Sequence, residues 1–361
     1  MAENKYRAGA IGHTGRGNFG HRLHMPYNQI GHIDFVALAD PDEGGRSKAL
    51  SDTQASSGYA DYREMLDKES LDIVSVCPRW VDQHEEMLLA CVEAGCHIYC
   101  EKPMTSDLAS ADRIVSSANA AGVKIAVAHQ GVYLPQMHAL HAIIASGQIG
   151  QLLAMEACGK QDHRGGGEDT LVLGTHLFNM MRFFAGDPLS VFGRVCQDGR
   201  DVQMEDTREA NEPIGLIAGD FITSTHYFHS DVVGHFVSRK NQLSKGRGYG
   251  LVLIGESGRL AINGDASWVA ELNSDVWSPW AGGLAWQALD IPKSSLQEDG
   301  NRLAILSLVD AIENDTEPIS SAGDARWALE MIHGIYASHL AHARVSLPLA
   351  ERGHPLAIER R

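Results

Sequence analysis

A charged pair followed by a proline stands directly after an apolar segment in HIYCEKPMT, residues 97–105. Residues 97–100 favour a short strand, so the Glu-Lys-Pro triplet lies where that strand ends. Because Pro103 fixes the local backbone, the ammonium of Lys102 can be directed at a bound cofactor and a substrate hydroxyl. A lysine in that position can exchange a proton with an alcohol. The alternative is a solvated surface pair, which most Glu-Lys dipeptides form.

The first 130 residues alternate short apolar segments with amphipathic helical ones, as repeated βαβ units do. Helical spacing of apolar residues indicates helices at about 83–94 and 106–121. This alternation predicts an α/β fold with a parallel, doubly wound Rossmann sheet covered by helices on both faces. In such a sheet the strand ends border a ligand crevice, and Lys102 would stand there. The strand candidates are residues 6–11, 33–39, 72–77, 97–100 and 124–129.

A glycine-rich turn, IGHTGRGNFGH, follows the first strand candidate. Gly12 permits a tight turn, and the backbone of Thr14, Gly15 and Arg16 can approach a pyrophosphate closely. We expect a helix after this turn, whose N-terminal N–H groups and dipole would bind the phosphates. The match to the dinucleotide fingerprint is displaced, because its GxGxxG spacing begins at Gly15, beyond the end of the strand.

Asp40 ends the second strand candidate, 28 residues beyond Gly12. An acid at this point can accept hydrogen bonds from the adenosine ribose, and it repels the 2′-phosphate of NADP. We therefore predict NAD as the cofactor in preference to NADP, although Arg46 keeps NADP open. The simpler interpretation of Asp40 is a turn residue before Pro41. Loops after the other strands should border the same cofactor, and they contribute Cys77, Arg79, Trp80, His84, Glu101, Lys102 and Gln130.

The pattern changes after residue 130. Residues 190–290 contain several strand candidates separated by polar turns, and helices return toward the C-terminal end. We predict two domains, a NAD(P)-binding Rossmann domain at 1–130 and an α+β domain at 131–361 for substrate binding and oligomerisation. The second domain should contain a large, open and mostly antiparallel sheet. Its helix at 324–342 can pack back on the first domain.

The composition is that of a globular protein, with 44% hydrophobic and 21% charged residues. A net charge of −16 repels phosphate backbones and anionic membranes, which argues against nucleic acid and membrane partners. The six cysteines lack paired CxxC spacing and should be reduced and buried, and we predict no metal site. No secretory leader pattern and no apolar segment of membrane-spanning length is visible, so we expect a cytoplasmic protein.

The combination of AIGHTGRG, ALADPD, AGCHIYCEKPMT and GTHLFNMMRFFAGDP resembles the Gfo/Idh/MocA family over almost the whole chain. This family is named after glucose-fructose oxidoreductase, inositol dehydrogenase and a rhizopine-catabolism protein. The resemblance implies NAD(P)-dependent oxidation or reduction of sugars, inositols and related alcohols. It implies an oligomer formed through the C-terminal sheet, here a homodimer or homotetramer. It also makes Lys102 the catalytic lysine, followed by Pro103 as a cis-proline.

One feature that is common in this family is missing from the sequence. Family members commonly carry an Asp four residues before a catalytic His. The matching histidine is His176, but Val172 occupies the earlier position, and Asn179 stands where another Asp is frequent. On a continuous helix Asp169 would share a face with His176, and it could replace the missing acid. A second glycine-rich segment, DHRGGGED at residues 162–169, precedes this histidine. It could close over a polar substrate, or it could be a plain connection beside a core histidine. The predicted substrate set is Lys102, His163, Arg164, Glu168, Asp169, His176 and Asn179.

Three functions fit these residues. The first is a dehydrogenase that transfers a hydride between nicotinamide and a secondary alcohol of a sugar, cyclitol or sugar derivative, with Lys102 and His176 moving the proton. The second is a glycoside-cleaving enzyme that oxidises the sugar transiently with a tightly held NAD and then eliminates the glycosidic bond. The third is a nucleotide-sensing protein without activity, which the retained Lys102 and His176 disfavour. We adopt the first as the expectation.

Overall fold

The computed structural model describes residues 6–242, 248–273 and 285–357. The chain folds into two compact units. The first unit comprises residues 1–130, 212–215 and 300–326, and the second comprises the remaining segments. The C-terminal part of the chain thus contributes residues 300–326 to the first unit. From Trp327 onward the chain belongs to the second unit.

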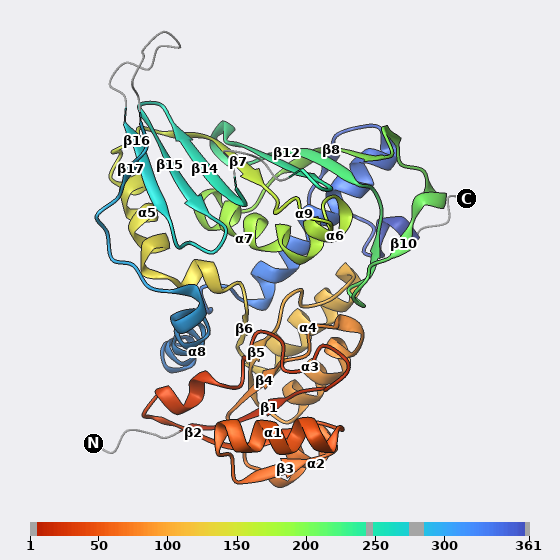
Figure 1. The fold of residues 1–361 in the computed structure, drawn as a ribbon, viewed down its shortest axis with the longest axis vertical. Helices are drawn as coiled ribbons and strands as arrows, with labels where there is room; N and C mark the ends of the chain where they lie inside the picture. Colours follow the sequence, from red (N-terminus) through yellow and green to blue (C-terminus); the bar gives the residue numbers. More distant parts are fainter. Residues whose placement is uncertain (1–5, 243–247, 274–284, 358–361) are drawn as a thin grey trace. The chain divides into compact units, whose positions relative to one another are not determined.

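A six-stranded parallel sheet forms the centre of the first unit, with the strand order β3-β2-β1-β4-β5-β6 (Figure 1). This order reverses between β1 and β4, which confirms the predicted doubly wound Rossmann sheet. Strands β4 and β6 are buried along their whole length, because helices cover the sheet on both sides. The strands are β1 (Tyr6–Ile11), β2 (Ile33–Ala39), β3 (Ser57–Tyr59), β4 (Ile73–Val76), β5 (His97–Cys100) and β6 (Ile125–Val127).

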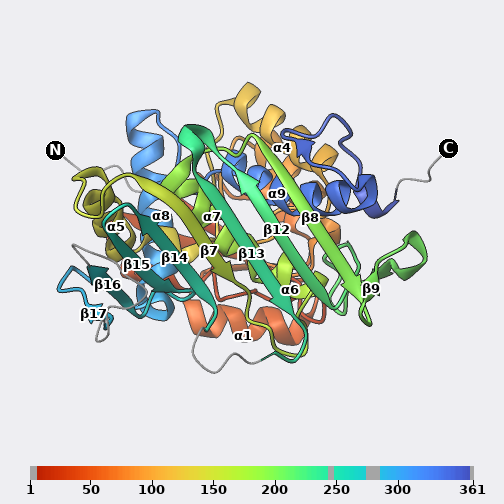
Figure 2. The ribbon, with the colours of Figure 1, turned by 90° about the horizontal axis from the view of Figure 1, so that it is seen from above.

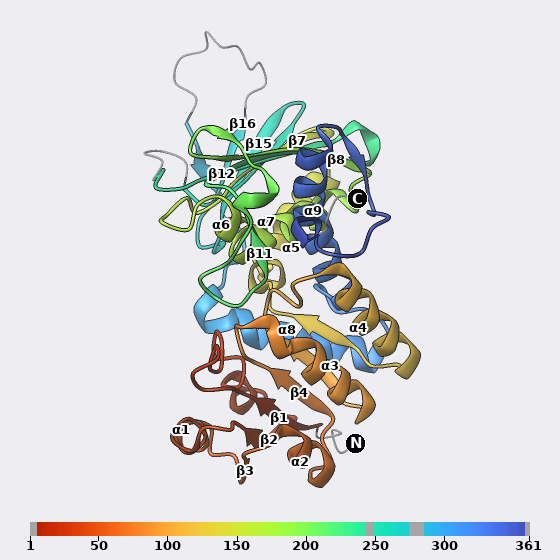
Figure 3. The ribbon, with the colours of Figure 1, turned by 90° about the vertical axis from the view of Figure 1, so that its right-hand side faces the viewer.

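Helix α1 lies on one side of this sheet, and α3 and α4 lie on the other (Figure 3). Three helices begin after an aspartate whose side chain accepts a hydrogen bond from a backbone N–H of the first turn, namely Asp42, Asp61 and Asp107. The predicted helices at 83–94 and 106–121 are confirmed. The helices of this unit are α1 (Glu43–Thr53), α2 (Tyr62–Lys68), α3 (His84–Glu93), α4 (Leu108–Ala121) and most of α8 (Leu296–Asn314).

The prediction of a helix after the glycine-rich turn is wrong. Residues 12–32, all of which the structure describes, contain turns and a single 3₁₀ segment, η1 (Pro26–Gln29), but no α-helix. Three glycines of this loop have φ values of +85°, +87° and +51°, and Asn18 and Arg22 are also left-handed, at +54° and +63°. A right-handed helix cannot continue through so many left-handed residues. The loop therefore presents no helix dipole to a phosphate, and the N–H groups of Thr14, Gly15 and Arg16 are bonded within the protein.

The second unit is built on a large sheet with the order β17-β16-β15-β14-β7-β13-β12-β8-β18 (Figure 2). Only β7 and β13 pair in parallel among the described strands of this sheet, so the predicted mostly antiparallel arrangement is confirmed. The strands are β7 (Leu152–Cys158), β8 (Ser190–Gln197), β9 (Arg200–Asp201), β12 (Phe221–Tyr227), β13 (Val233–Arg239), β14 (Gly250–Gly255), β15 (Gly258–Asn263), β16 (Val269–Asn273), β17 (Gln287–Ala288) and β18 (Val345–Ser346), with β10 (Arg208–Glu209) and β11 (Leu216–Ile217) as a separate pair.

Helices α7 and α9 pack against one face of this sheet. The ring of Phe178 on α7 contacts that of Phe236 on β13 with centroids 4.8 Å apart, and His226 on β12 lies 3.3 Å from the carbonyl oxygen of Met331 on α9. Burial lowers the pKa of His226 to about 4, so it is a neutral core residue and not a pocket-lining one. The helices are α5 (Pro135–Ala145), α6 (Gly167–Val172), α7 (Gly174–Ala185) and α9 (Ala322–Ala341). Among all described helices, none combines the length and apolarity that crossing a membrane requires.

Candidate functional site

Glu101, the first residue after β5, is fully buried and is the centre of the candidate site in the first unit. Its Oε2 accepts hydrogen bonds from the backbone N–H (2.9 Å) and the Nδ1 (2.8 Å) of His21. Burial acts to raise the pKa of this carboxyl, but the charge and hydrogen bonds of His21 and the charge of Lys102 outweigh it and lower the pKa overall. The stabilisation by Glu101 is therefore complete above the ordinary carboxyl pKa and is lost as pH falls through the lowered value.

Two glycines allow the loop after β1 to reach this carboxylate. A Cβ on Gly20 would clash with the carbonyl oxygen of Cys77 and with Oε2 of Glu101. A Cβ on Gly17 would clash with the backbone nitrogen of Arg79. The glycine-rich loop therefore packs directly on the segments that follow β4 and β5, and the displaced GxGxxG spacing in the sequence is the signal of that packing.

Lys102 follows at the carboxyl end of β5, with a side chain that is only 5% exposed. Its backbone N–H donates to Oε1 of Glu101 over 2.9 Å, and the Lys102–Pro103 peptide bond is cis, as the family resemblance implies. The carboxylate of Glu101 thus fixes the lysine backbone and the glycine-rich loop at the same time. The charged pair is a buried structural unit and not a solvated surface pair.

Asn301 also belongs to this network, although sequence reasoning did not find it. Its Oδ1 accepts hydrogen bonds from the hydroxyl of Tyr99 (2.8 Å) and from Nε2 of Gln130 (3.1 Å), while its Nδ2 donates to the carbonyl oxygen of His21 (2.9 Å). The predicted residue Gln130 therefore acts through Asn301 on the loop that carries His21. Because Asn301 comes from α8, far along the chain, no local pattern could have revealed it.

Asp40, at the end of β2, is fully buried with its carboxylate turned to the glycine-rich loop. Its Oδ2 accepts a hydrogen bond from the hydroxyl of Thr14 (2.7 Å), and both carboxylate oxygens lie 3.1 Å from the Thr14 nitrogen. Arg46 donates to the backbone carbonyl of Asp40 (2.7 Å) and not to the carboxylate. A carboxylate that already binds a hydroxyl suits the ribose of NAD and repels the extra phosphate of NADP. A cavity of ≈ 730 Å³ between this loop and α1 adjoins Thr14.

Arg16, Arg79 and Trp80 lie at the loops next to this network. Arg16 forms an ion pair with Asp82, and its guanidinium lies 5.5 Å from the ring centroid of Trp80. Arg79 forms an ion pair with Glu212, from the short segment 212–215 that belongs to the first unit. Both arginines are partly exposed and remain available to a phosphate.

Cys77 and His84, which the sequence places beside the cofactor, are both completely buried. Burial raises the pKa of the Cys77 thiol well above its ordinary value, so it is an inert core group. Burial also lowers the pKa of His84, an effect that two carbonyl oxygens near its ring oppose. Neither side chain has a surface that a ligand could reach.

The predicted continuous helix around His176 is divided into α6 and α7 at Leu173. Leu173 has a φ of −114°, and its carbonyl oxygen accepts a hydrogen bond from the hydroxyl of Tyr249 (3.1 Å). Gly174 follows directly and favours the break. The prediction that Asp169 shares a helix face with His176 depended on an unbroken helix and is wrong. His176 is 9% exposed, and Asn179 is 3% exposed.

Asp169 anchors the loop before α6 and is fully buried. Its Oδ2 accepts hydrogen bonds from the hydroxyl of Ser238 (2.5 Å) and the backbone N–H of Gln161 (3.1 Å), and its Oδ1 accepts one from the backbone N–H of Lys160 (3.3 Å). Burial raises the pKa of Asp169. The Asp169 carboxyl thus links the segment after β7 to β13. Because it is engaged there, it does not replace the acid that family members carry at the position of Val172.

The other predicted residues of this loop are distributed between buried and exposed positions. Arg164 binds Asp162 through NH2 (2.7 Å) and Nε (3.2 Å), which lowers the pKa of Asp162 to about 2. Glu168 is buried and accepts a hydrogen bond from Asn211 (2.6 Å). The side chain of His163 is 78% exposed and is the member of this set most open to a ligand.

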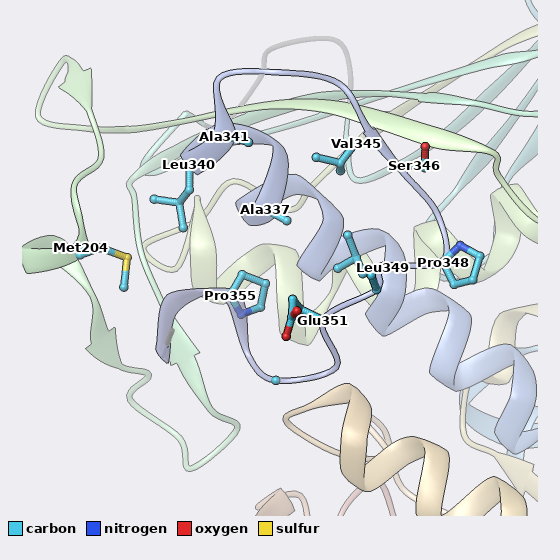
Figure 4. A pocket seen from close by; sticks show the side chains of 12 residues that line it. Met204, Ala337, Leu340, Ala341, Val345, Ser346, Pro348, Leu349, Glu351 and Pro355 are labelled. Atoms are coloured by element: carbon cyan, nitrogen blue, oxygen red, sulfur yellow. The ribbon is translucent and has the colours of Figure 1, made fainter. Parts of the chain in front are cut away.

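Two further observations limit the chemistry. The described residues hold no group of three or more His, Cys, Asp and Glu that could bind a metal ion. A cavity of ≈ 460 Å³ at the C-terminal end of α9 is lined by Leu340, Pro348 and Leu349 (Figure 4). Its lining is apolar apart from Ser346 and Glu351, which does not suit a polyhydroxylated substrate.

The strand order of the first unit, its glycine-rich loop and its hydroxyl-binding acid after β2 define a protein of the NAD-binding Rossmann class. The model of a family described as "Oxidoreductase family, NAD-binding Rossmann fold" (GFO_IDH_MocA) matches residues 9–129. The match lies within the first unit, so residues 9–129 are similar to the NAD-binding domain of this oxidoreductase family.

One relative and several solved structures match the chain over nearly its full length. Inositol 2-dehydrogenase 4 of Saccharopolyspora erythraea is 23% identical over 360 residues, which is 98% of each protein. An NAD-binding oxidoreductase from Klebsiella pneumoniae superposes with a TM-score of 0.75 at 19% identity, covering 95% of this chain and 99% of that one. A levoglucosan dehydrogenase in complex with NADH and levoglucosan superposes with a TM-score of 0.76 at 16% identity, covering 96% and 100%.

The contact between the glycine-rich loop and Glu101 predicts different effects of alanine at two glycines. Gly20→Ala should weaken NAD binding about tenfold or more, because its Cβ would displace the loop from Glu101. Gly95→Ala is the matched control, since Gly95 is also left-handed, has no atom within 4 Å of an added Cβ and lies outside the predicted cofactor set. Titration calorimetry measures the NAD⁺ affinity of both variants. Equal affinities in the two variants would contradict the role of the Gly20 contact.

Proposed function

We propose that this protein is a dehydrogenase that oxidises a secondary alcohol of a sugar, a cyclitol or a sugar derivative. The observation that carries the proposal is the buried Lys102 at the carboxyl end of β5, whose backbone N–H is held by the carboxylate of Glu101. An alcohol must give up its hydroxyl proton as it loses a hydride, which requires a proton acceptor at that oxygen. When bound, NAD supplies the hydride acceptor.

We assign proton transfer at the reacting hydroxyl to Lys102 and, on the family resemblance, to His176. Residues 1–130 are the proposed cofactor domain, in which Asp40 binds the ribose and Arg16 and Arg79 are available to the pyrophosphate. Residues 131–361 are the proposed substrate domain, to which Asn179 and the exposed His163 contribute. The inositol and levoglucosan dehydrogenases among the similar proteins support a polyhydroxylated substrate.

Glycoside cleavage is the less favoured reaction. It would draw on an acid from the loop at 162–169 in place of Val172. Asp162 is instead paired with Arg164, Glu168 is buried against Asn211, and Asp169 is bonded to backbone groups and Ser238. With all three carboxyls engaged, net oxidation of the alcohol agrees better with the described contacts.

The purified protein should reduce NAD⁺ with at least one member of a panel of inositols, free sugars and levoglucosan, followed by the absorbance of NADH. Lys102→Ala should lower turnover by about 10²–10⁴-fold with little change in NAD⁺ affinity, because it removes only the proton acceptor. Lys124→Ala is the matched control, since Lys124 precedes β6 at the amino ends of the parallel strands and pairs with Asp315. An active Lys102→Ala enzyme would contradict the assignment, and cleaved glycoside without NADH would indicate the other reaction.

We also propose that the chain forms a homodimer or homotetramer through the second unit. Two large apolar side chains of its sheet are exposed, Leu153 on β7 (43%) and Phe192 on β8 (48%), and exposed apolar surface of this kind often marks an interface. Analytical ultracentrifugation should therefore find an oligomer, and Phe192→Arg should shift it toward the monomer. A monomeric wild-type protein at micromolar concentration would contradict this proposal.

A further inference from the structure

His84 lies completely buried at the start of α3, with both ring nitrogens close to backbone carbonyl oxygens. Its Nε2 is 2.6 Å from the carbonyl oxygen of Pro78, and its Nδ1 is 3.0 Å from that of Met104. Pro78 precedes Arg79 in the loop after β4, and Met104 follows the Lys102–Pro103 bond after β5. One side chain therefore connects two loops that belong to different strand ends.

Each ring nitrogen of His84 lies against a carbonyl oxygen. A carbonyl oxygen only accepts hydrogen bonds, and a neutral imidazole has a single N–H, so it can satisfy only one of the two carbonyls. Burial lowers the pKa of His84 overall, although the two carbonyl oxygens and the charge of Glu101 act to raise it. The ring therefore donates to one carbonyl and places its other nitrogen against the second. The nearby thiol of Cys100 donates to the carbonyl oxygen of Glu101 (3.1 Å) and does not compete for either carbonyl.

We propose that His84 is a positioning residue, which fixes the spacing between the loop after β4 and Lys102 and so sets the lysine for proton transfer. This rests on the proposed function, in which Lys102 is the proton acceptor. His84 has no exposed surface and so acts through the two loops, not on the cofactor or the substrate. Displacement of a catalytic group by about 1 Å can cost about a hundredfold in rate, so a buried residue of this kind can control turnover.

The first experiment compares His84→Gln with His226→Gln. Glutamine fills similar space but has a single side-chain nitrogen, so it cannot place a nitrogen against each of the two carbonyls. His226 is the matched control, because it is also fully buried and its ring has one carbonyl partner, Met331. In His84→Gln we expect kcat to fall about tenfold or more, while the Kd for NAD⁺ changes less than about threefold. His226→Gln should leave kcat within about twofold.

The second measurement does not depend on activity. Backbone amides in the two loops are bonded, for example Glu101 N–H to Val76 (2.9 Å) and Val81 N–H to Pro213 (2.9 Å), so hydrogen exchange reports their opening. In His84→Gln, amide exchange in segments 77–81 and 101–105 should accelerate together by about tenfold or more. His226→Gln should leave both segments unchanged.

Rescue of His84→Gly by small molecules tests the need for a ring N–H. Neutral imidazole has one N–H that can donate to a carbonyl oxygen, whereas neutral 1-methylimidazole has none. Imidazole should restore slow exchange and turnover, and 1-methylimidazole should restore neither. Should the glycine variant not fold without imidazole, the His84→Gln comparison decides the question.

Unchanged kcat in His84→Gln, or equal rescue by both imidazoles, would overturn the proposal. A wild-type protein that oxidises no member of the polyol panel would instead count against the proposed dehydrogenase. In that case the exchange measurement still decides whether His84 holds the two loops together. Slow exchange retained in both loops of His84→Gln would overturn the positioning role by itself.

Discussion

The buried carboxylate of Glu101 is the interaction on which the rest of the candidate site depends. A fully buried charge is costly unless it is paired and hydrogen-bonded, and here the partners are His21 and the backbone of Lys102. One carboxylate therefore attaches the glycine-rich loop to the end of β5. The cofactor loop and the proposed proton acceptor are held as a single unit before any ligand arrives, which is the preorganisation that catalysis requires.

The same constraint explains why the loop after β1 is not a helix. To place His21 on Glu101, the chain must pass close to the backbone after β4 and β5, where only glycine fits. Left-handed residues provide that path and prevent helical geometry. Asn301 secures the carbonyl of His21 from the side of α8. The Rossmann strand order is thus retained without a helix directly after β1.

The strands of the first sheet other than β3, and the position of Lys102, could be predicted from the sequence, because apolar strand segments and their polar ends follow one another at short range. The short β3 has no buried residue and so gave no apolar signal. Two parts of the site could not be predicted from the sequence. Asn301 reaches Gln130 and Tyr99 from a distant helix, and nothing local announces a contact of that range. The break at Leu173 depends on a hydrogen bond from Tyr249, a residue of another segment, so periodicity alone suggested one helix and misplaced Asp169.

The affinity of the Glu101→Gln variant for NAD⁺, measured by titration calorimetry, tests the role of this carboxylate most directly. The substitution keeps the shape of the side chain but removes the charge that His21 and Lys102 share. If Glu101 organises the site, the Kd should rise about tenfold or more, because the glycine-rich loop loses its anchor. A Kd within about twofold of the wild-type value would contradict the central role of this carboxylate.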